Sequence, residues 1–205
     1  MILSKTSPAV EPSADERRRS IRHPALAQVA KIRLESGREE LCQLCDISAE
    51  GVRAQVYVPL AVGARIEVEL RTAHSARGRV VWAADNLIGV CFDAPIPAAA
   101  MLAHCSFEAN GGNLRPPRLK VNLRGLLRIG TEAKVVGIGN ISQAGLQVEA
   151  PEPLRTGTGC TIALPGLPAR AATICWWREA NAGLMLTESF DYETFAKWRA
   201  GTGGR

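Results

Sequence analysis

The sequence predicts a mainly β protein made of two small antiparallel β-barrels in tandem. Its 205 residues are enough for two domains, since about 100 residues is a common domain size. Nineteen glycines and twelve prolines, with a hydrophobic fraction of 46%, indicate many short strands joined by turns around two cores. The third observation, and the strongest, is an internal repeat.

The repeat relates the two halves of the chain. The segment Asp46-Ile-Ser-Ala-Glu-Gly51 recurs 94 residues later as Asn140-Ile-Ser-Gln-Ala-Gly145. The same offset then holds for the pairs Pro59 and Pro153, Gly63 and Gly157, Trp82 and Trp176, and Gly89 and Gly183. One unbroken offset over this length indicates a duplicated domain.

Each copy contains the same series of short strands. Apolar and polar residues alternate from 119 to 129 in the second copy and less regularly around 29–34 in the first. A strand leads into the repeated segment, and others follow at 52–58 and 146–150, at 65–70 and 160–164, up to Trp82 and Trp176, and at 88–92 and 183–186. Five to seven antiparallel strands favour a closed barrel, because closure leaves no exposed edge.

A short helix is expected to close each copy, over 95–104 in the first and over 191–199 in the second. Asp191 is a favourable N-cap for the second helix. Its aromatic stripe, which we expect to pack on its own barrel, consists of Tyr192, Phe195 and Trp198 or Arg199.

Charge and hydropathy favour a cytoplasmic protein without a membrane span. The net charge is +5, and basic residues cluster at Arg17–Arg22 and at Arg115–Arg128. Such clusters suggest phosphate-bearing partners, although a solvated strand face is the commoner explanation. The longest weakly apolar stretch, 95–103, is far shorter than the ~20 residues that cross a bilayer. The first residues lack the apolar core of a secretory signal.

The sequence does not indicate an enzyme, a metal site or a cofactor. Cys42 and Cys45 form a C-x-x-C, but their odd separation within a strand places them on opposite faces, so buried inert thiols are expected. The three histidines fit no ligand pattern, and no spacing of Ser, His and Asp suggests a nucleophile.

Two motifs carry the chemistry of the first copy. Arg18-Arg-Ser-Ile-Arg22 precedes the first strand, and the Asp46–Gly51 segment follows the second. An arginine can both fork onto a phosphate and lie flat on a purine. Asp46 is a pure acceptor, and Ser48 both donates and accepts. Gly51 is expected to permit a positive φ and a close backbone approach at the turn.

This pair of motifs, R-x-x-x-R and D/N-x-S-x-x-G, resembles the PilZ domain family. The resemblance implies six-stranded antiparallel barrels with a C-terminal helix, and a receptor for cyclic di-GMP bound through Arg18, Arg22, Asp46, Ser48 and Gly51. It divides the chain into a disordered segment 1–15, a first PilZ domain 16–106, a linker 107–117, a second PilZ domain 118–200 and a disordered tail 201–205.

The second copy departs from the arginine motif. Arg118 aligns with Arg22, but Leu114 stands where the first arginine is required, and Arg115 lies one residue out of register. The residues that remain for a second, degenerate site are Arg115, Arg118, Asn140, Ser142 and Gly145. Two interpretations stay open: a structural or partner-binding barrel, or a site in which Arg115 substitutes.

Three functional hypotheses follow. The first is a non-enzymatic cyclic di-GMP effector, in which ligand binding changes the arrangement of the barrels and a protein partner responds, in control of motility, biofilm or exopolysaccharide. The second is a ligand-free interaction adaptor with the same fold. The third, nucleic-acid binding through the basic face around 118–128, is not favoured because aromatic residues are absent from that stretch.

Overall fold

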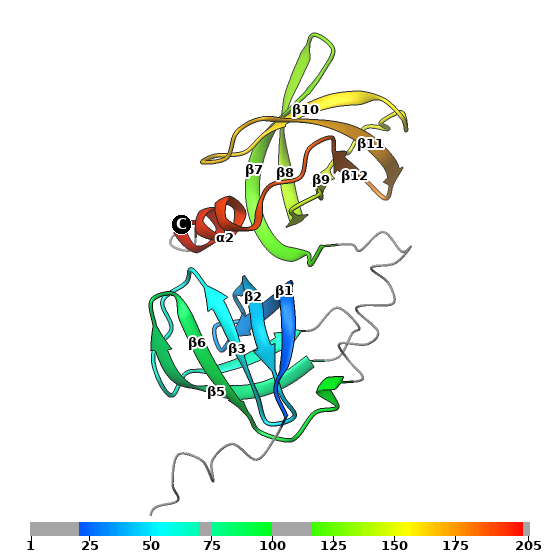
Figure 1. Ribbon diagram of the computed structural model, residues 1–205. Helices are drawn as coiled ribbons and strands as arrows, with labels where there is room; N and C mark the ends of the chain where they lie inside the picture. The colour runs from blue at the N-terminus through cyan, green and yellow to red at the C-terminus, as the bar shows by residue number, and fades with distance from the viewer. Residues whose placement is uncertain (1–20, 70–74, 100–115, 203–205) are drawn as a thin grey trace, which may run out of the picture.

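The computed structural model describes residues 21–69, 75–99 and 116–202, which form two closed antiparallel barrels of six strands each (Figure 1). The first barrel closes in the order β1-β2-β3-β6-β5-β4. Its strands are β1 (His23–Leu34), β2 (Glu39–Ile47), β3 (Gly51–Val56), β4 (Arg65–Glu69), β5 (Ser75–Ala84) and β6 (Leu87–Phe92).

The second barrel repeats this topology, in the order β7-β8-β9-β12-β11-β10 around the ring. Its strands are β7 (Leu119–Ile129), β8 (Glu132–Ser142), β9 (Gly145–Glu149), β10 (Gly159–Ala163), β11 (Arg170–Arg178) and β12 (Asn181–Leu186). The predicted fold class and the duplication are therefore confirmed. Each barrel encloses an apolar core contributed by the inward-facing positions of its strands.

The predicted C-terminal helix is present as α2 (Tyr192–Gly201). Its N-cap is Asp191, whose side chain accepts a hydrogen bond from the backbone N–H of Thr194 at 2.8 Å. The helix runs one residue into the segment expected to be a disordered tail, and Thr202 forms its C-cap, so that boundary is wrong. Of the short helix expected over 95–104, residues 95–99 are described; 98 and 99 are helical, and 95–97 are not.

Two of the repeated residues form one packing unit in each barrel. A Cβ on Gly89 would lie 2.0 Å from the indole nitrogen of Trp82, and Gly183 stands in the same relation to Trp176. The repeated glycine is required because the indole lies directly against its backbone. Trp and Gly therefore recur together in the sequence because the indole packs on the backbone of the neighbouring strand, at a position where a Cβ would not fit.

Gly51 is also required for a close approach, but not for a left-handed conformation. A Cβ on this residue would lie 2.3 Å from the carbonyl oxygen of Val90 in β6. Its φ is not positive, so that part of the expectation for Gly51 is wrong. The glycine lets β3 and β6 pair closely just beyond the motif turn.

The two cysteines of the C-x-x-C differ in burial, as their positions on opposite faces predict. Cys42 is fully buried in the first core, and burial raises its pKa to about 12. Cys45 is only half-buried, so the expectation of a buried thiol is wrong for this residue, and neither cysteine forms a disulfide. Among the described residues, no group of His, Cys, Asp or Glu is placed to hold a metal ion.

Helix α2 lies between the two barrels rather than on its own barrel alone (Figure 1). Phe195 and Trp198 pack into the second core, as expected for the aromatic stripe. Tyr192 instead donates a hydrogen bond to the carbonyl of Gln55 at 2.9 Å, in the first barrel. Arg38, also in the first barrel, donates to the carbonyl oxygens of the last helical turn, at 3.1 and 3.0 Å. The helix therefore joins the barrels, and a cation of one barrel caps the helix of the other.

The start of β2 is the first barrel's main contribution to this interface. Leu41 is 2% exposed and packs with the core residues of the second barrel. The Glu39 carboxylate accepts the backbone N–H of Lys120 in β7 at 2.7 Å, and the Glu39 carbonyl accepts from Arg199 of α2 at 2.9 Å. Strand β2 thus pairs with β1 and β3 of the first barrel, while the residues at its start also contact the second barrel and α2.

Glu39 and Glu40 are buried carboxylates with opposite pKa shifts. Burial acts to raise the pKa of Glu39, but the N–H of Lys120 and the cations of Lys31 and Arg33 outweigh it, so the pKa is lowered. Burial dominates at Glu40 and raises its pKa despite the ion pairs with Arg38 and Arg199. Glu39 is therefore the carboxylate that the interface holds firmly in its charged form.

Replacing Gly51 by alanine should lower the free energy of unfolding by about 1–3 kcal/mol, the usual cost of forcing an extra carbon into a packed region. Its Cβ would overlap the Val90 carbonyl, which belongs to a strand backbone. The control is Gly139→Ala, because a Cβ there meets nothing within 4 Å. Urea unfolding measures both variants, and equal stability of the two would contradict the packing assigned to Gly51.

Glu39→Gln should cost about 3 kcal/mol of stability at neutral pH, because it removes the charged acceptor from a buried set of donors. A lowered folded-state pKa gives stability that is present above the ordinary glutamate value and lost as the pH falls through the folded value. The difference from wild type should therefore shrink below pH 4.5, the ordinary value for glutamate.

The control for this substitution is Glu35→Gln, an exposed residue on the same hairpin, which should leave stability unchanged at every pH. Urea titrations of the three proteins over a pH series make the comparison. A stability difference for Glu39→Gln that stayed constant down to acid pH would show that the carboxylate charge does not stabilise the interface.

Candidate functional site

The motif turn between β2 and β3 is held by its own serine. The backbone N–H of Ser48 donates to the carbonyl of Gly51 at 2.8 Å, and its hydroxyl donates to the same oxygen at 3.3 Å. Ser48 is 3% exposed, so its hydroxyl faces the turn rather than solvent. In this structure Ser48 shapes the site, and its direct contact with a ligand stays a prediction.

Asp46 lies between two guanidinium groups at the mouth of this turn. Arg22, which precedes β1, places Nη1 2.5 Å from one carboxylate oxygen. Arg53, on β3, places Nε 2.7 Å from the other. Asp46 is mostly covered, while the side chains of Arg22 and Arg53 are 56% and 48% exposed. The structure thus brings together two of the predicted site residues and adds a third.

Arg53 is the residue that the motifs did not reveal. Strands β2 and β3 pair so that Asp46 lies opposite Arg53, after a shift of register between Leu44 and Asp46. Opposite residues of an antiparallel pair have neighbouring side chains. The only signal in the sequence was an arginine shortly after the turn, and the register shift hides which residue it faces. Arg18 lies outside the described residues.

This arrangement suits an anionic ligand with polar edges. Two cations and one carboxylate leave a net positive charge, and a guanidinium has five N–H donors, only some of which Asp46 uses. A carboxylate accepts up to about four hydrogen bonds, so Asp46 keeps acceptor capacity beside its two arginines. The exposed guanidinium faces are free to stack on a flat ring.

The second barrel has the same turn, with uncharged amide side chains in place of Asp46 and Arg53. The hydroxyl of Ser142 donates to the Gly145 carbonyl at 3.0 Å. Arg118 donates to Asn140 at 3.1 Å, which repeats the relation of Arg22 to Asp46. The Asn140 amide donates in turn to Gln147, the counterpart of Arg53, at 2.5 Å. Arg115 lies outside the described residues.

A hollow of about 370 Å³ adjoins this second turn. Arg178 lies over the Trp176 ring, with its guanidinium carbon 5.1 Å from the ring centroid. The hollow is lined by Arg118, Gln147, Trp176, Arg178, Glu179 and Asn181. The second barrel therefore lacks the arginine on β9 but carries one on β11, where the first barrel has alanine.

Comparison with protein families identifies the first barrel. The sequence profile of the PilZ domain family, described as "PilZ domain", matches residues 16–108. The match covers the first barrel, and the second barrel repeats the strand order of the first. The resemblance to this family that the R-x-x-x-R and D/N-x-S-x-x-G motifs indicated is confirmed for this part of the chain.

Several solved structures align with most of the chain, at low identity and with TM-scores below 0.5. The Borreliella burgdorferi PlzA protein in complex with c-di-GMP is 10% identical, with a TM-score of 0.39, 91% of this chain covered and 95% of that one. Bacillus subtilis MotI/DgrA, an inhibitor of motility, is 12% identical, with a TM-score of 0.35 and coverages of 84% and 94%. YcgR from Escherichia coli in complex with c-di-GMP is 10% identical, with a TM-score of 0.29 and coverages of 85% and 81%. No curated protein sequence matches the chain.

Within the described ranges, no helix has the length and apolar character needed to cross a membrane.

Arg22→Ala and Arg53→Ala should each change the free energy of unfolding by less than about 1 kcal/mol. Both side chains are about half exposed, and exposed ion pairs contribute little to stability. Urea unfolding of the two variants beside wild type measures this. A loss of several kcal/mol would show that these arginines hold the barrel together rather than serve a surface site.

Proposed function

We propose that the first barrel binds cyclic di-GMP through Arg18, Arg22, Asp46, Ser48 and Gly51, and that the chain acts by binding rather than by catalysis. The observation that carries the proposal is the contact of Arg22 with Asp46. It brings the arginine motif and the turn motif, 24 residues apart in sequence, to one point on the surface of a PilZ domain.

The chemistry of this ligand matches the groups at the site. Cyclic di-GMP carries two phosphate charges, two broad guanine faces and edges rich in N–H donors. Arg18 and Arg22 supply forked donors for phosphate and flat faces for guanine. Asp46 accepts from a guanine edge, with Arg53 beside it as a further cation. Ser48 and Gly51 act mainly by shaping the turn that presents Asp46.

The interaction free energies available at the site are sufficient for an affinity in the micromolar range. A micromolar complex requires about 8 kcal/mol. Hydrogen bonds to charged groups contribute roughly 1.5–3 kcal/mol each, so a few of them with stacking reach this value. The cost of ordering side chains and a chain segment at the site reduces the total.

Transmission to a protein partner is proposed to run through β2. Asp46 lies near the end of this strand, and Glu39 to Leu41 at its start contact the second barrel and α2. A change at the turn that alters β2 therefore acts directly on the barrel interface. The partner and the pathway, in motility, biofilm or exopolysaccharide control, belong to this proposal.

One observation favours the rival hypothesis of a ligand-free adaptor. Both carboxylate oxygens of Asp46 are already paired with arginines of the same chain. In an adaptor these pairs would be permanent features of the surface. In a receptor, Arg22 must turn toward the ligand, at a cost that is small because its pair is exposed.

Calorimetric titration of cyclic di-GMP into wild type, Arg18→Ala and Arg118→Ala tests the proposal. Arg18→Ala should abolish binding or weaken it at least tenfold, since it removes a charge-assisted contact of at least about 1.5 kcal/mol. Arg118→Ala is the matched control in the second barrel and should leave the main binding event intact.

The stoichiometry from the same titration shows whether the second, degenerate site takes ligand. That site is proposed to consist of Arg115, Arg118, Asn140, Ser142 and Gly145. Binding of equal strength by wild type and Arg18→Ala would refute the assignment of the first barrel. Absence of heat with wild type, confirmed by unchanged protein spectra, would favour the adaptor.

A further inference from the structure

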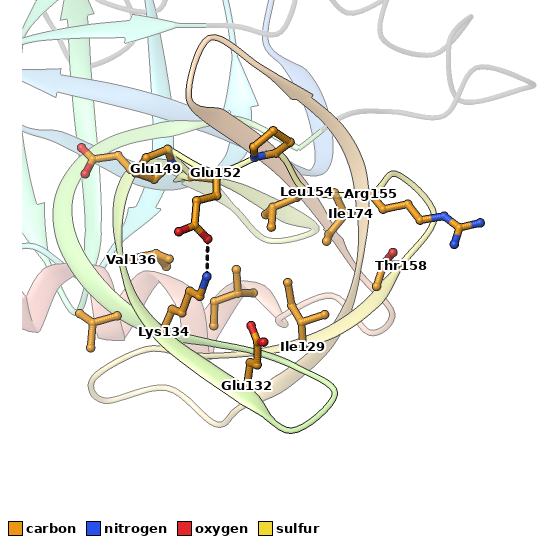
Figure 2. A pocket seen from close by; sticks show the side chains of 15 residues that line it. Ile129, Glu132, Lys134, Val136, Glu149, Glu152, Leu154, Arg155, Thr158 and Ile174 are labelled. Carbon is orange, nitrogen blue, oxygen red and sulfur yellow. Dashed lines mark hydrogen bonds and ion pairs between the residues drawn. The ribbon is translucent and has the colours of Figure 1, made fainter.

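The end of the second barrel that points away from the first contains a cavity of about 440 Å³ (Figure 2). This volume is within the usual range for small-molecule sites. The deep part of the cavity is apolar, and Leu127, Val136 and Ile174 there are almost fully buried. Ile129 and Leu154 continue the apolar wall toward the opening. The mouth carries charged residues on both sides.

The corresponding end of the first barrel is closed. The strand pairing identifies the equivalent positions in the two barrels. Glu40 lies opposite Ile32 in β1, as Lys134 lies opposite Leu127 in β7. Near Glu40 the first barrel receives Arg199 of α2, which is 8% exposed. Ala200 of the same helix packs against the first core. The side chain of Arg199, with its aliphatic part and its guanidinium group, thus covers this end of the first barrel.

Substitutions in the wall explain why the second barrel is open there. Buried Val56 and Val58 of the first barrel become Ala150 and Glu152, at the offset of the repeat. The smaller alanine leaves space in the wall. Glu152 leaves the core position and reaches the mouth, where it pairs with Lys134 at 2.5 Å (Figure 2).

The charges at the mouth determine which kind of ligand the cavity can bind. Glu132 lies across the opening from Glu152, while Glu149 and Arg155 point away from the cavity (Figure 2). Two carboxylates, those of Glu132 and Glu152, and one inward cation, Lys134, leave the mouth negative. Among the described residues, Glu132 has no ion pair or hydrogen bond that occupies its carboxylate, whereas Glu152 is paired with Lys134. The mouth therefore presents one unpaired carboxylate beside one ion pair.

A helix end like that of α2 does not suit this mouth. In the first barrel, Arg38 donates to the terminal carbonyls of α2. At that position the second barrel has Glu132, which cannot donate and would repel carbonyl oxygens. A cation with its own N–H donors, carried on an apolar stem, satisfies both the mouth and the wall.

We propose that this cavity binds a small organic cation, an amine or guanidine with an aliphatic stem of a few carbons. The stem lies against Leu127, Ile129 and Ile174, and the cationic head donates to Glu132 and to Glu152. Lys134 competes for Glu152, so it weakens binding of the cation. This site is separate from the motif turns and does not depend on their ligand.

The probe is n-butylguanidine, which reproduces an arginine side chain with its α-carbon, and the matched control is pentanoate, with the same chain and a carboxylate head. Titration of each into the ¹⁵N-labelled full chain is followed by amide chemical shifts. Butylguanidine should shift amides of residues 132–136 and 150–158 and leave the first barrel unchanged, and pentanoate should bind at least tenfold more weakly. A pentanoate affinity equal to that of butylguanidine, or shifts elsewhere only, would overturn the proposal.

Three variants sharpen the test. Glu132→Gln and Glu152→Gln should each weaken butylguanidine about tenfold, because each removes a charged acceptor. Lys134→Ala should strengthen binding, since it frees Glu152 from its ion pair. Glu188→Gln, an exposed carboxylate outside the cavity, is the control and should match wild type.

Equal binding by all four variants would refute the role of the mouth. N-acetylarginine methylamide distinguishes the source of the cation, because it carries the same head on a peptide backbone. If it binds more tightly than butylguanidine, the cavity receives an arginine of a protein, and the assignment to a small molecule is wrong.

Discussion

The hydrogen bonds of Glu39 at the start of β2 are the constraint on which the arrangement of the two barrels depends. Its carboxylate accepts from the backbone of Lys120, and its carbonyl accepts from Arg199. Both donors belong to the second half of the chain, one on a strand and one on the helix. Because the pKa of Glu39 is lowered, its carboxylate accepts from Lys120 as a charged group at neutral pH, while the bond to its carbonyl is charge-assisted by the Arg199 guanidinium. The motif residue Asp46 then lies seven positions along the same strand.

Duplication preserved the backbone and exchanged the chemistry at a few positions. The Trp and Gly packing unit and the serine-held turn are the same in both barrels, since they shape the strands. Most of the exchanged positions have side chains that face a surface or an interface, and Val58 is a core position whose counterpart Glu152 reaches the surface. In the first and second barrel respectively they are Arg38 and Glu132, Glu40 and Lys134, Asp46 and Asn140, Arg53 and Gln147, and Val58 and Glu152. One fold thus gives a charged turn and a closed end in one copy, and a neutral turn and an open end in the other.

The sequence predicted the features that depend on local pattern and repetition. Alternation of apolar and polar residues located the strands, and the constant offset showed two equal barrels rather than one large sheet. Asp191 correctly marked the start of α2. These signals are local, so a single sequence is enough to reveal them.

The features that it did not predict depend on contacts between distant segments. The stripe of α2 suggested packing on its own barrel, but the direction in which Tyr192 and Arg199 point is set by the position of the other barrel. Arg53 was missed because an irregularity in β2 shifts which residue of β3 faces Asp46. The open end of the second barrel follows from one valine replaced by alanine and one by glutamate, and neither change disturbs the strand pattern.

The interface limits how a ligand at the turn can act on the second barrel. Separating the barrels would expose Leu41, take the Lys120 N–H from Glu39 and part Arg199 from Glu40, and breaking one buried charged pair costs about 3–5 kcal/mol. A ligand shifts an equilibrium only by its differential affinity for the two states, so full separation requires a preference of at least about a hundredfold for the separated form. A pivot that keeps these bonds requires much less. The same contacts that hold the barrels together therefore favour a small rotation about the start of β2 over opening of the interface.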